Sequence, residues 1–125
     1  MKRILVIDDE IQIQDMVQSM LENEGYAVSV AANGRQGIDA FHQHLTDIVI
    51  TDIMMPGKDG IETIREIRKT SPEAKIIAMT GYRGPFNRLP AAEYVGAQIT
   101  LLKPFTKKQL LQAVHDILQK EPSAP

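Results

Sequence analysis

Five short apolar runs alternate along this chain with longer segments of helical periodicity. The runs are too short for helices and cover residues 4–7, 26–30, 48–50, 76–79 and 99–102. The first, third and fourth runs do not alternate with polar residues, which is typical of strands buried on both faces. The pattern predicts an α/β fold with a doubly wound, five-stranded parallel sheet, helices on both faces and right-handed crossovers.

The segments between the runs carry apolar stripes at helical spacing. The clearest stripes are Ile13, Met16, Val17, Met20 and Leu21, and then Leu110, Leu111, Val114, Ile117 and Leu118. Thr106 with Gln109 resembles a capping box at the start of a helix, as does Asp59 with Glu62. Gly25 stands where the first helix would end.

The chain has 125 residues with 43% hydrophobic and 24% charged side chains, which is the size and composition of one domain. We expect that domain over residues 1–120, followed by a tail or the start of a linker at 121–125. The net charge of −2 has no long run of one sign, so direct nucleic-acid or membrane binding is not expected. The lack of cysteine excludes disulfides and thiol chemistry and fits a cytoplasmic protein.

Polar residues follow four of the five predicted strands. These residues are Asp8, Asp9 and Glu10 after the first strand, Asp52 after the third, Thr80 after the fourth and Lys103 after the fifth. The carboxyl ends of parallel strands meet at one edge, and ligands bind where the strand order reverses. Each residue alone has a structural explanation, such as an aspartate capping the next helix. Helix capping does not require polar residues at four strand ends, so the coincidence predicts a functional cluster.

The predicted cluster is too anionic to stay fully ionised without compensation. Two carboxylates about 4 Å apart repel by about 4 kcal/mol at an effective dielectric constant of about 20. A bound proton or cation relieves this repulsion, and ligands that are all oxygen favour Mg²⁺ or Mn²⁺ over zinc. The Lys103 ammonium and the Thr80 hydroxyl are donors for phosphoryl oxygens. The set therefore suits phosphoryl transfer to an aspartate.

Several other phosphate sites are excluded by the same residues. The chain contains neither a P-loop motif nor a dinucleotide-binding glycine motif after its first strand. The acidic run of residues 8–10 would repel the phosphate of a flavin mononucleotide. It also lacks the Asp-x-Asp pattern of haloacid-dehalogenase-type phosphatases.

With these motifs, the chain resembles the receiver (phosphoacceptor) domain of two-component response regulators. The likeness extends over residues 2–120, and its motifs occupy residues 4–10, 47–60, 76–81 and 102–105. The four motifs in this order and spacing are strongly specific. The resemblance implies a flavodoxin-like sheet of order 2-1-3-4-5 and a histidine kinase or phosphotransfer protein as phosphodonor.

The resemblance also implies a role for each site residue. Asp52 would accept the phosphoryl group. The implied Mg²⁺ ligands are Asp8, Asp9, Asp52 and the backbone carbonyl of Met54. A cis peptide bond between Lys103 and Pro104 would direct the lysine side chain inward, where it would pair with the phosphoryl group. Thr80 would hydrogen-bond the same group and shift the domain between two states.

Two features depart from the usual receiver pattern, and two further residues bear on the lifetime of the phosphoryl group. Thr100 occupies the position, three residues before the lysine, where the family usually has an aromatic side chain; Tyr94, Tyr82 and Phe86 are the available substitutes. The prolines and glycines of residues 81–90 predict a short helix that begins near Pro90. Met54 and Tyr82 stand at two positions that tune phosphate lifetime in this family; their bulky side chains would either hinder the attacking water and slow dephosphorylation or lie flat on the surface.

Three functions are compatible with these residues. The first is a phosphorylation-controlled switch, which turns over no separate substrate and acts on a missing C-terminal output domain or a separate target protein. A phosphorylation-dependent homodimer is part of this hypothesis. The second is a degenerate receiver that serves as a phosphorylation-independent interaction module, and the third is a Mg²⁺-dependent phosphatase.

Overall fold

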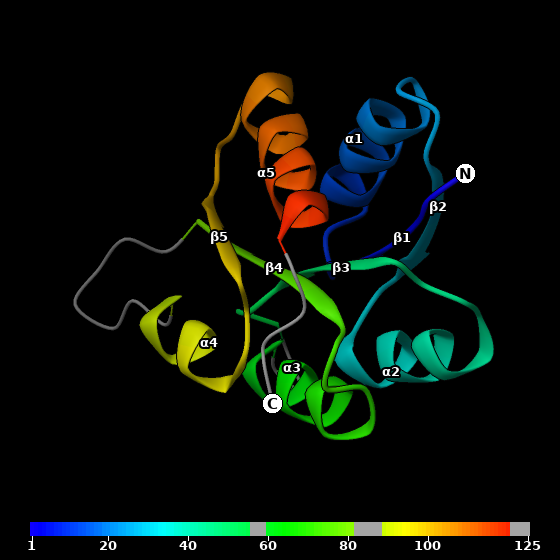
Figure 1. Cartoon of the computed structure of the whole chain (residues 1–125). Helices are drawn as coiled ribbons and strands as arrows, with labels where there is room; N and C mark the ends of the chain where they lie inside the picture. Colours follow the sequence, from blue (N-terminus) through cyan, green and yellow to red (C-terminus); the bar gives the residue numbers. More distant parts are fainter. Residues whose placement is uncertain (56–59, 82–88, 121–125) are drawn as a thin grey trace.

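Strands and helices alternate along the chain in this computed structural model, which describes residues 1–55, 60–81 and 89–120 (Figure 1). The strands are β1 (Arg3–Ile7), β2 (Ala27–Ala31), β3 (Ile48–Asp52), β4 (Lys75–Thr80) and β5 (Ile99–Leu102). The helices are α1 (Ile11–Glu22), α2 (Gly34–Gln43), α3 (Gly60–Thr70), α4 (Leu89–Val95) and α5 (Lys107–Gln119).

The five strands form one parallel sheet in the order β2-β1-β3-β4-β5. Helices α1 and α5 cover one face of the sheet, and α2, α3 and α4 cover the other (Figure 1). The predicted doubly wound, flavodoxin-like fold is thus confirmed. The strand order reverses between β1 and β3, so the ligand crevice of such a sheet is expected at the carboxyl ends of these two strands.

Two apolar clusters hold the helices on the sheet, one on each face. Leu5 and Ile7 of β1 belong to the cluster under α2, α3 and α4. Ile4 and Val6 belong to the cluster under α1 and α5. Because successive side chains of a strand point to opposite faces, a strand covered on both sides is apolar throughout.

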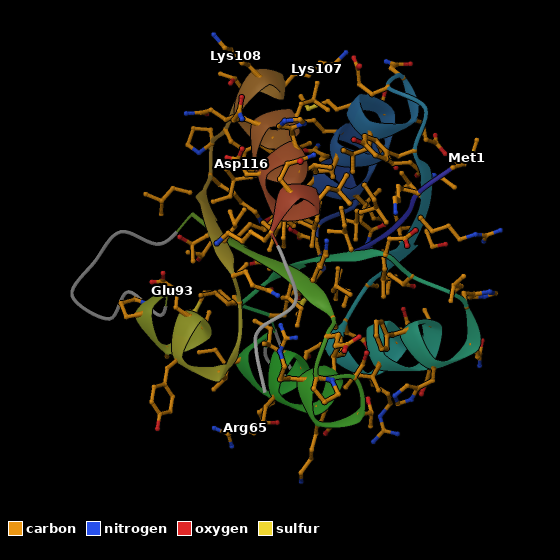
Figure 2. The ribbon with its side chains drawn as sticks, viewed as in Figure 1. Met1, Arg65, Glu93, Lys107, Lys108 and Asp116 are labelled. Carbon is orange, nitrogen blue, oxygen red and sulfur yellow. The ribbon has the colours of Figure 1, made fainter. Side chains whose placement is uncertain are left out.

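The outer faces of the helices carry charged side chains of both signs, among them Arg65, Glu93, Lys107 and Asp116 (Figure 2). The described part of the chain holds no helix that is long and apolar enough to span a bilayer.

The element ends agree with most of the signals in the sequence. The capping box of Thr106 and Gln109 is present at α5. Helix α1 ends at Glu22, and Gly25 adopts a φ of 92° in the turn that leads to β2. Helix α4 begins at Leu89, next to the predicted start. Asp59, the segment 82–88 and the predicted tail at 121–125 lie outside the described residues.

Candidate functional site

The register of the sheet brings the polar residues of four strands to one edge. Ile7 of β1 pairs with Thr51 of β3, so Asp8 and Asp52 follow side by side. Thr80 of β4 pairs with Leu102 of β5, which places Lys103 next. Asp52 and Thr80 are the last residues of their strands rather than the first residues after them, which corrects the predicted ends.

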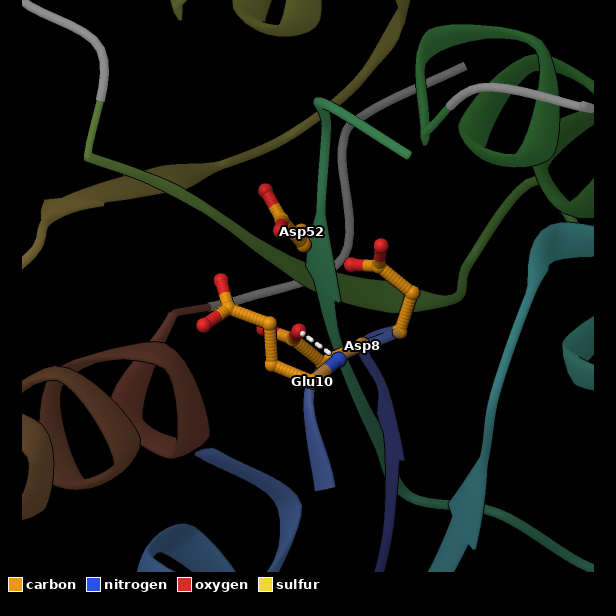
Figure 3. Close-up of side chains that lie close together, drawn as sticks. Asp8, Glu10 and Asp52 are labelled. Carbon is orange, nitrogen blue, oxygen red and sulfur yellow. Dashed lines mark hydrogen bonds between the residues drawn. The ribbon is translucent and has the colours of Figure 1, made fainter. Parts of the chain in front are cut away.

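Asp8 is fully buried and is held through both carboxylate oxygens. Its Oδ1 accepts a hydrogen bond of 2.9 Å from the backbone N–H of Glu10 (Figure 3). Its Oδ2 lies 2.7 Å from the Lys103 ammonium. Helix α1 takes Glu10 as its N-cap residue, so neither Asp8 nor Asp9 caps it. The alternative that these aspartates are helix caps is therefore wrong.

Lys103 is the cation of the cluster. Its Nζ lies 2.7 Å from Asp8 Oδ2, 3.2 Å from Asp52 Oδ2 and 4.0 Å from Glu10 Oε1. Burial lowers the pKa of Lys103, but the hydrogen bond to Asp8 and the charges of Asp52 and Asp8 outweigh burial and raise it above 10.5. The peptide bond between Lys103 and Pro104 is cis, as the resemblance implies.

Asp52 is 4% exposed, and its Oδ1 accepts a hydrogen bond of 3.1 Å from the backbone N–H of Met54. Burial raises the pKa of Asp52 above its ordinary value of 3.8, and the charge of Asp8 raises it further. The Met54 hydrogen bond and Lys103 lower this pKa but do not cancel the rise. Asp52 is thus a carboxylate that gains from any further positive charge nearby.

Four acidic side chains are close enough to share one cation. Carboxylate oxygens of Asp8, Asp9, Glu10 and Asp52 all lie within 4.8 Å of one another, and Asp8, Glu10 and Asp52 are labelled in Figure 3. Asp9 and Glu10 are exposed, whereas the other two are buried. A set of carboxylate oxygens with solvent on one side fits Mg²⁺, which keeps several water ligands. The cluster contains every predicted carboxylate ligand and adds Glu10.

The remaining predicted residues lie around the same cluster. Thr80 is 1% exposed and lines a hollow of about 330 Å³ together with Glu10, Asp52, Met54, Gly81 and Lys103. The Met54 side chain is half exposed beside this hollow, and the ligand role of its carbonyl stays a prediction. The structure therefore brings together all six predicted site residues.

Among the described residues, no aromatic side chain evidently replaces the ring that the family usually has at the position of Thr100. Thr100 lies on β5 opposite Ala78 and is partly buried. Tyr94 is 91% exposed on α4, so its ring does not fill this place. Tyr82 and Phe86 lie outside the described residues.

Metal-free protein is expected to be less stable at neutral pH than its Asp52→Asn variant, by about 1 kcal/mol. A raised pKa means that the folded state binds the Asp52 proton more tightly than the unfolded state. The stability that this proton provides is complete below 3.8, the ordinary pKa, and is lost as the pH rises through the higher folded-state value. Urea unfolding in a chelator, over a pH series, measures the difference between the two proteins.

The difference should shrink toward pH values below 3.8, where Asp52 is protonated in both states. Added Mg²⁺ should stabilise the wild type more than Asp52→Asn, because the ion needs ionised ligands. A constant difference at all pH values would contradict the raised pKa.

Comparisons with known proteins agree with the geometry. The family model of the response regulator receiver domain matches residues 4–115. The chain is 31% identical to the chemotaxis protein CheY4 of Vibrio cholerae, with a TM-score of 0.87 over 94% of this chain and 98% of that one. A response regulator receiver domain protein from Clostridium thermocellum is 34% identical, with a TM-score of 0.88 over 94% of both chains.

A third similar structure is the beryllofluoride-activated NtrC4 receiver domain dimer in solution. It is 32% identical and has a TM-score of 0.85 over 94% of this chain and 96% of that one. The fold, the acidic cluster and the lysine beside it are thus accompanied by a family match over most of the chain. The chain belongs to the response regulator receiver domains of two-component signalling, which are phosphoacceptors rather than enzymes with a separate substrate.

Proposed function

We propose that Asp52 accepts a phosphoryl group in a Mg²⁺-dependent reaction, with the phosphohistidine of a histidine kinase or phosphotransfer protein as donor. The observation that supports this most directly is the position of Lys103, 3.2 Å from Asp52 Oδ2 and beside an open hollow. A lysine that served only to neutralise buried acids would need no opening next to its partner.

In the proposed reaction, an Asp52 carboxylate oxygen attacks phosphorus and forms a P–O bond. The bond from phosphorus to the histidine nitrogen breaks, and its electron pair stays on that nitrogen. The Lys103 ammonium and the Thr80 hydroxyl would stabilise the negative charge of the transferred oxygens. The ion, held by Asp8, Asp9, Asp52 and the Met54 carbonyl, would neutralise carboxylate charge and bind a phosphoryl oxygen.

The test is the intact mass of the chain after incubation with an acyl phosphate and Mg²⁺. We expect one added phosphoryl group on the wild type, and none on Asp52→Ala or in the presence of a chelator. Asp39→Ala, a change of an exposed aspartate on α2, is the matched control and should react like the wild type.

Two other results would replace the proposal. A folded, Mg²⁺-binding chain that gains no mass would be a phosphorylation-independent interaction module. Repeated turnover of an external phosphoester would make the chain a phosphatase.

The switch would act on a partner or on an output domain beyond the receiver segment of residues 1–120. The location proposed for this switch is the cytoplasm, which is typical of receiver domains. Dimerisation on phosphorylation is supported by the NtrC4 receiver domain, which is a dimer in its activated form. Sedimentation of the phosphorylated and unphosphorylated chain compares the two states directly.

A further inference from the structure

Gln14 is a glutamine on the buried face of α1. The buried residues of this helix are Gln14, Val17 and Leu21. Gln14 is 9% exposed, whereas Gln12 on the same helix turn is exposed. A buried side-chain amide is nearly always hydrogen-bonded, because leaving it without a partner is costly. The contact that Gln14 makes therefore shows what a polar side chain does at this position.

The Gln14 amide donates a buried hydrogen bond of 2.6 Å, from Nε2 to the backbone carbonyl of Asp8. This carbonyl belongs to the peptide unit that joins Asp8 to Asp9. On the other side, the Asp8 N–H donates to the carbonyl of Ala31 at 3.1 Å, so the backbone is held from β2 as well. Gln14 itself is fixed in the first turn of α1, where its own N–H donates to Glu10 O at 3.0 Å.

The orientation of this one peptide unit sets the directions of two acidic side chains. A rotation of the unit would move the Cα–Cβ bonds of Asp8 and Asp9 relative to each other, and with them two of the carboxylates that lie within 4.8 Å in the cluster. Magnesium requires oxygen ligands in nearly ideal octahedral geometry, so it tolerates little change of this kind. Removal of a group that hydrogen-bonds to a metal ligand and orients it typically weakens metal binding by about 10- to 100-fold.

We infer that Gln14 is a positioning residue for the metal site: its amide fixes the peptide unit between Asp8 and Asp9 and so sets both carboxylates for a divalent cation. The inference rests on the proposed function for the identity of the ion. Gln14 is not a ligand, since its bond goes to a backbone oxygen. The residue couples the first turn of α1 to the acidic cluster.

The test is calorimetric titration of the full chain with Mg²⁺, in the wild type and in Gln14→Met. Methionine keeps the length and burial of glutamine but cannot donate the hydrogen bond. We expect Gln14→Met to bind Mg²⁺ about 10-fold more weakly than the wild type. Gln12→Met places the same side chain on the same helix turn, but on its exposed side, and should leave the affinity unchanged.

A second measurement needs only the wild type. In a Mg²⁺ titration followed by nuclear magnetic resonance, the side-chain amide signals of Gln14 should shift with the same dissociation constant as the backbone amide of Asp9. The side-chain signals of Gln12 should stay constant. This arm decides the inference even if Gln14→Met does not fold.

Equal Mg²⁺ affinity of Gln14→Met and wild type would overturn the inference, even if thermal unfolding showed a loss of stability. Constant Gln14 signals through the titration would overturn it as well. Neither arm requires phosphorylation. A chain that binds Mg²⁺ but accepts no phosphoryl group refutes only the proposed function, and a chain that binds no Mg²⁺ refutes both.

Discussion

Lys103→Met is expected to slow phosphorylation by an acyl phosphate by about 100-fold, the usual effect of removing one donor from a transition state. It should also destabilise the metal-free protein by about 3 kcal/mol. Both effects have the same origin, since the Lys103 ammonium lies 2.7 Å from Asp8 and 3.2 Å from Asp52, and these side chains are 0% and 6% exposed. Without the cation, two buried carboxylates face each other without compensation. Mass spectrometry and urea unfolding measure the two effects.

The matched control is Lys107→Met. Lys107 forms an ion pair of 3.4 Å with Glu24, but both side chains are nearly half exposed. Such surface pairs contribute less than about 1 kcal/mol, and this pair is not part of the acidic cluster. Mg²⁺ should recover part of the stability lost in Lys103→Met, because it replaces the missing positive charge. Phosphorylation of Lys103→Met at the wild-type rate would contradict the proposed role of the ammonium.

The strands of the fold were predictable because three of them are buried on both faces. A short, continuous apolar run such as Ile4–Val6 is typical of a strand whose two faces are both covered, and its residues do lie in the clusters on both faces of the sheet. The strand ends were less predictable, since β3 continues through Thr51 and Asp52 although these side chains are polar. The ladder is formed by backbone groups, and Asp52 still pairs with Met79. A change in side-chain polarity therefore precedes the true end of the strand.

The site was predictable as a cluster because the strand ends of a parallel sheet coincide. The role of Gln14 was not, because an apolar stripe by definition omits a glutamine. Its signal was the spacing of Gln14, Val17 and Leu21, which places the three side chains on one face of α1. The hydrogen-bond partner of a buried amide depends on the orientation in which the helix packs on the sheet. That orientation is a tertiary property that no pattern within the helix contains.

Gly60→Ala is expected to destabilise the protein by about 3 kcal/mol, a large part of the total stability of a single domain. A Cβ atom at Gly60 would lie 2.2 Å from the carbonyl oxygen of Asp52 and 2.5 Å from the Cα of Ile53. Both atoms belong to the backbone at the end of β3, so no side-chain rotation relieves the overlap. Either α3 or the end of β3 must move.

A movement of the end of β3 would affect the acidic cluster as well as the stability of the protein. Displacement of the Asp52 backbone would also move its carboxylate, so the Mg²⁺ affinity of Gly60→Ala should fall together with its stability. Gly81→Ala is the matched control, at a glycine that lines the hollow beside Asp52. A Cβ atom there would meet its nearest neighbour, Lys103 Cβ, at an ordinary contact distance of 3.5 Å. Urea unfolding and Mg²⁺ calorimetry compare the two variants. If Gly60→Ala were as stable as Gly81→Ala, the start of α3 would not be packed closely against the backbone of Asp52 and Ile53, and the expected coupling to the Asp52 carboxylate would be absent.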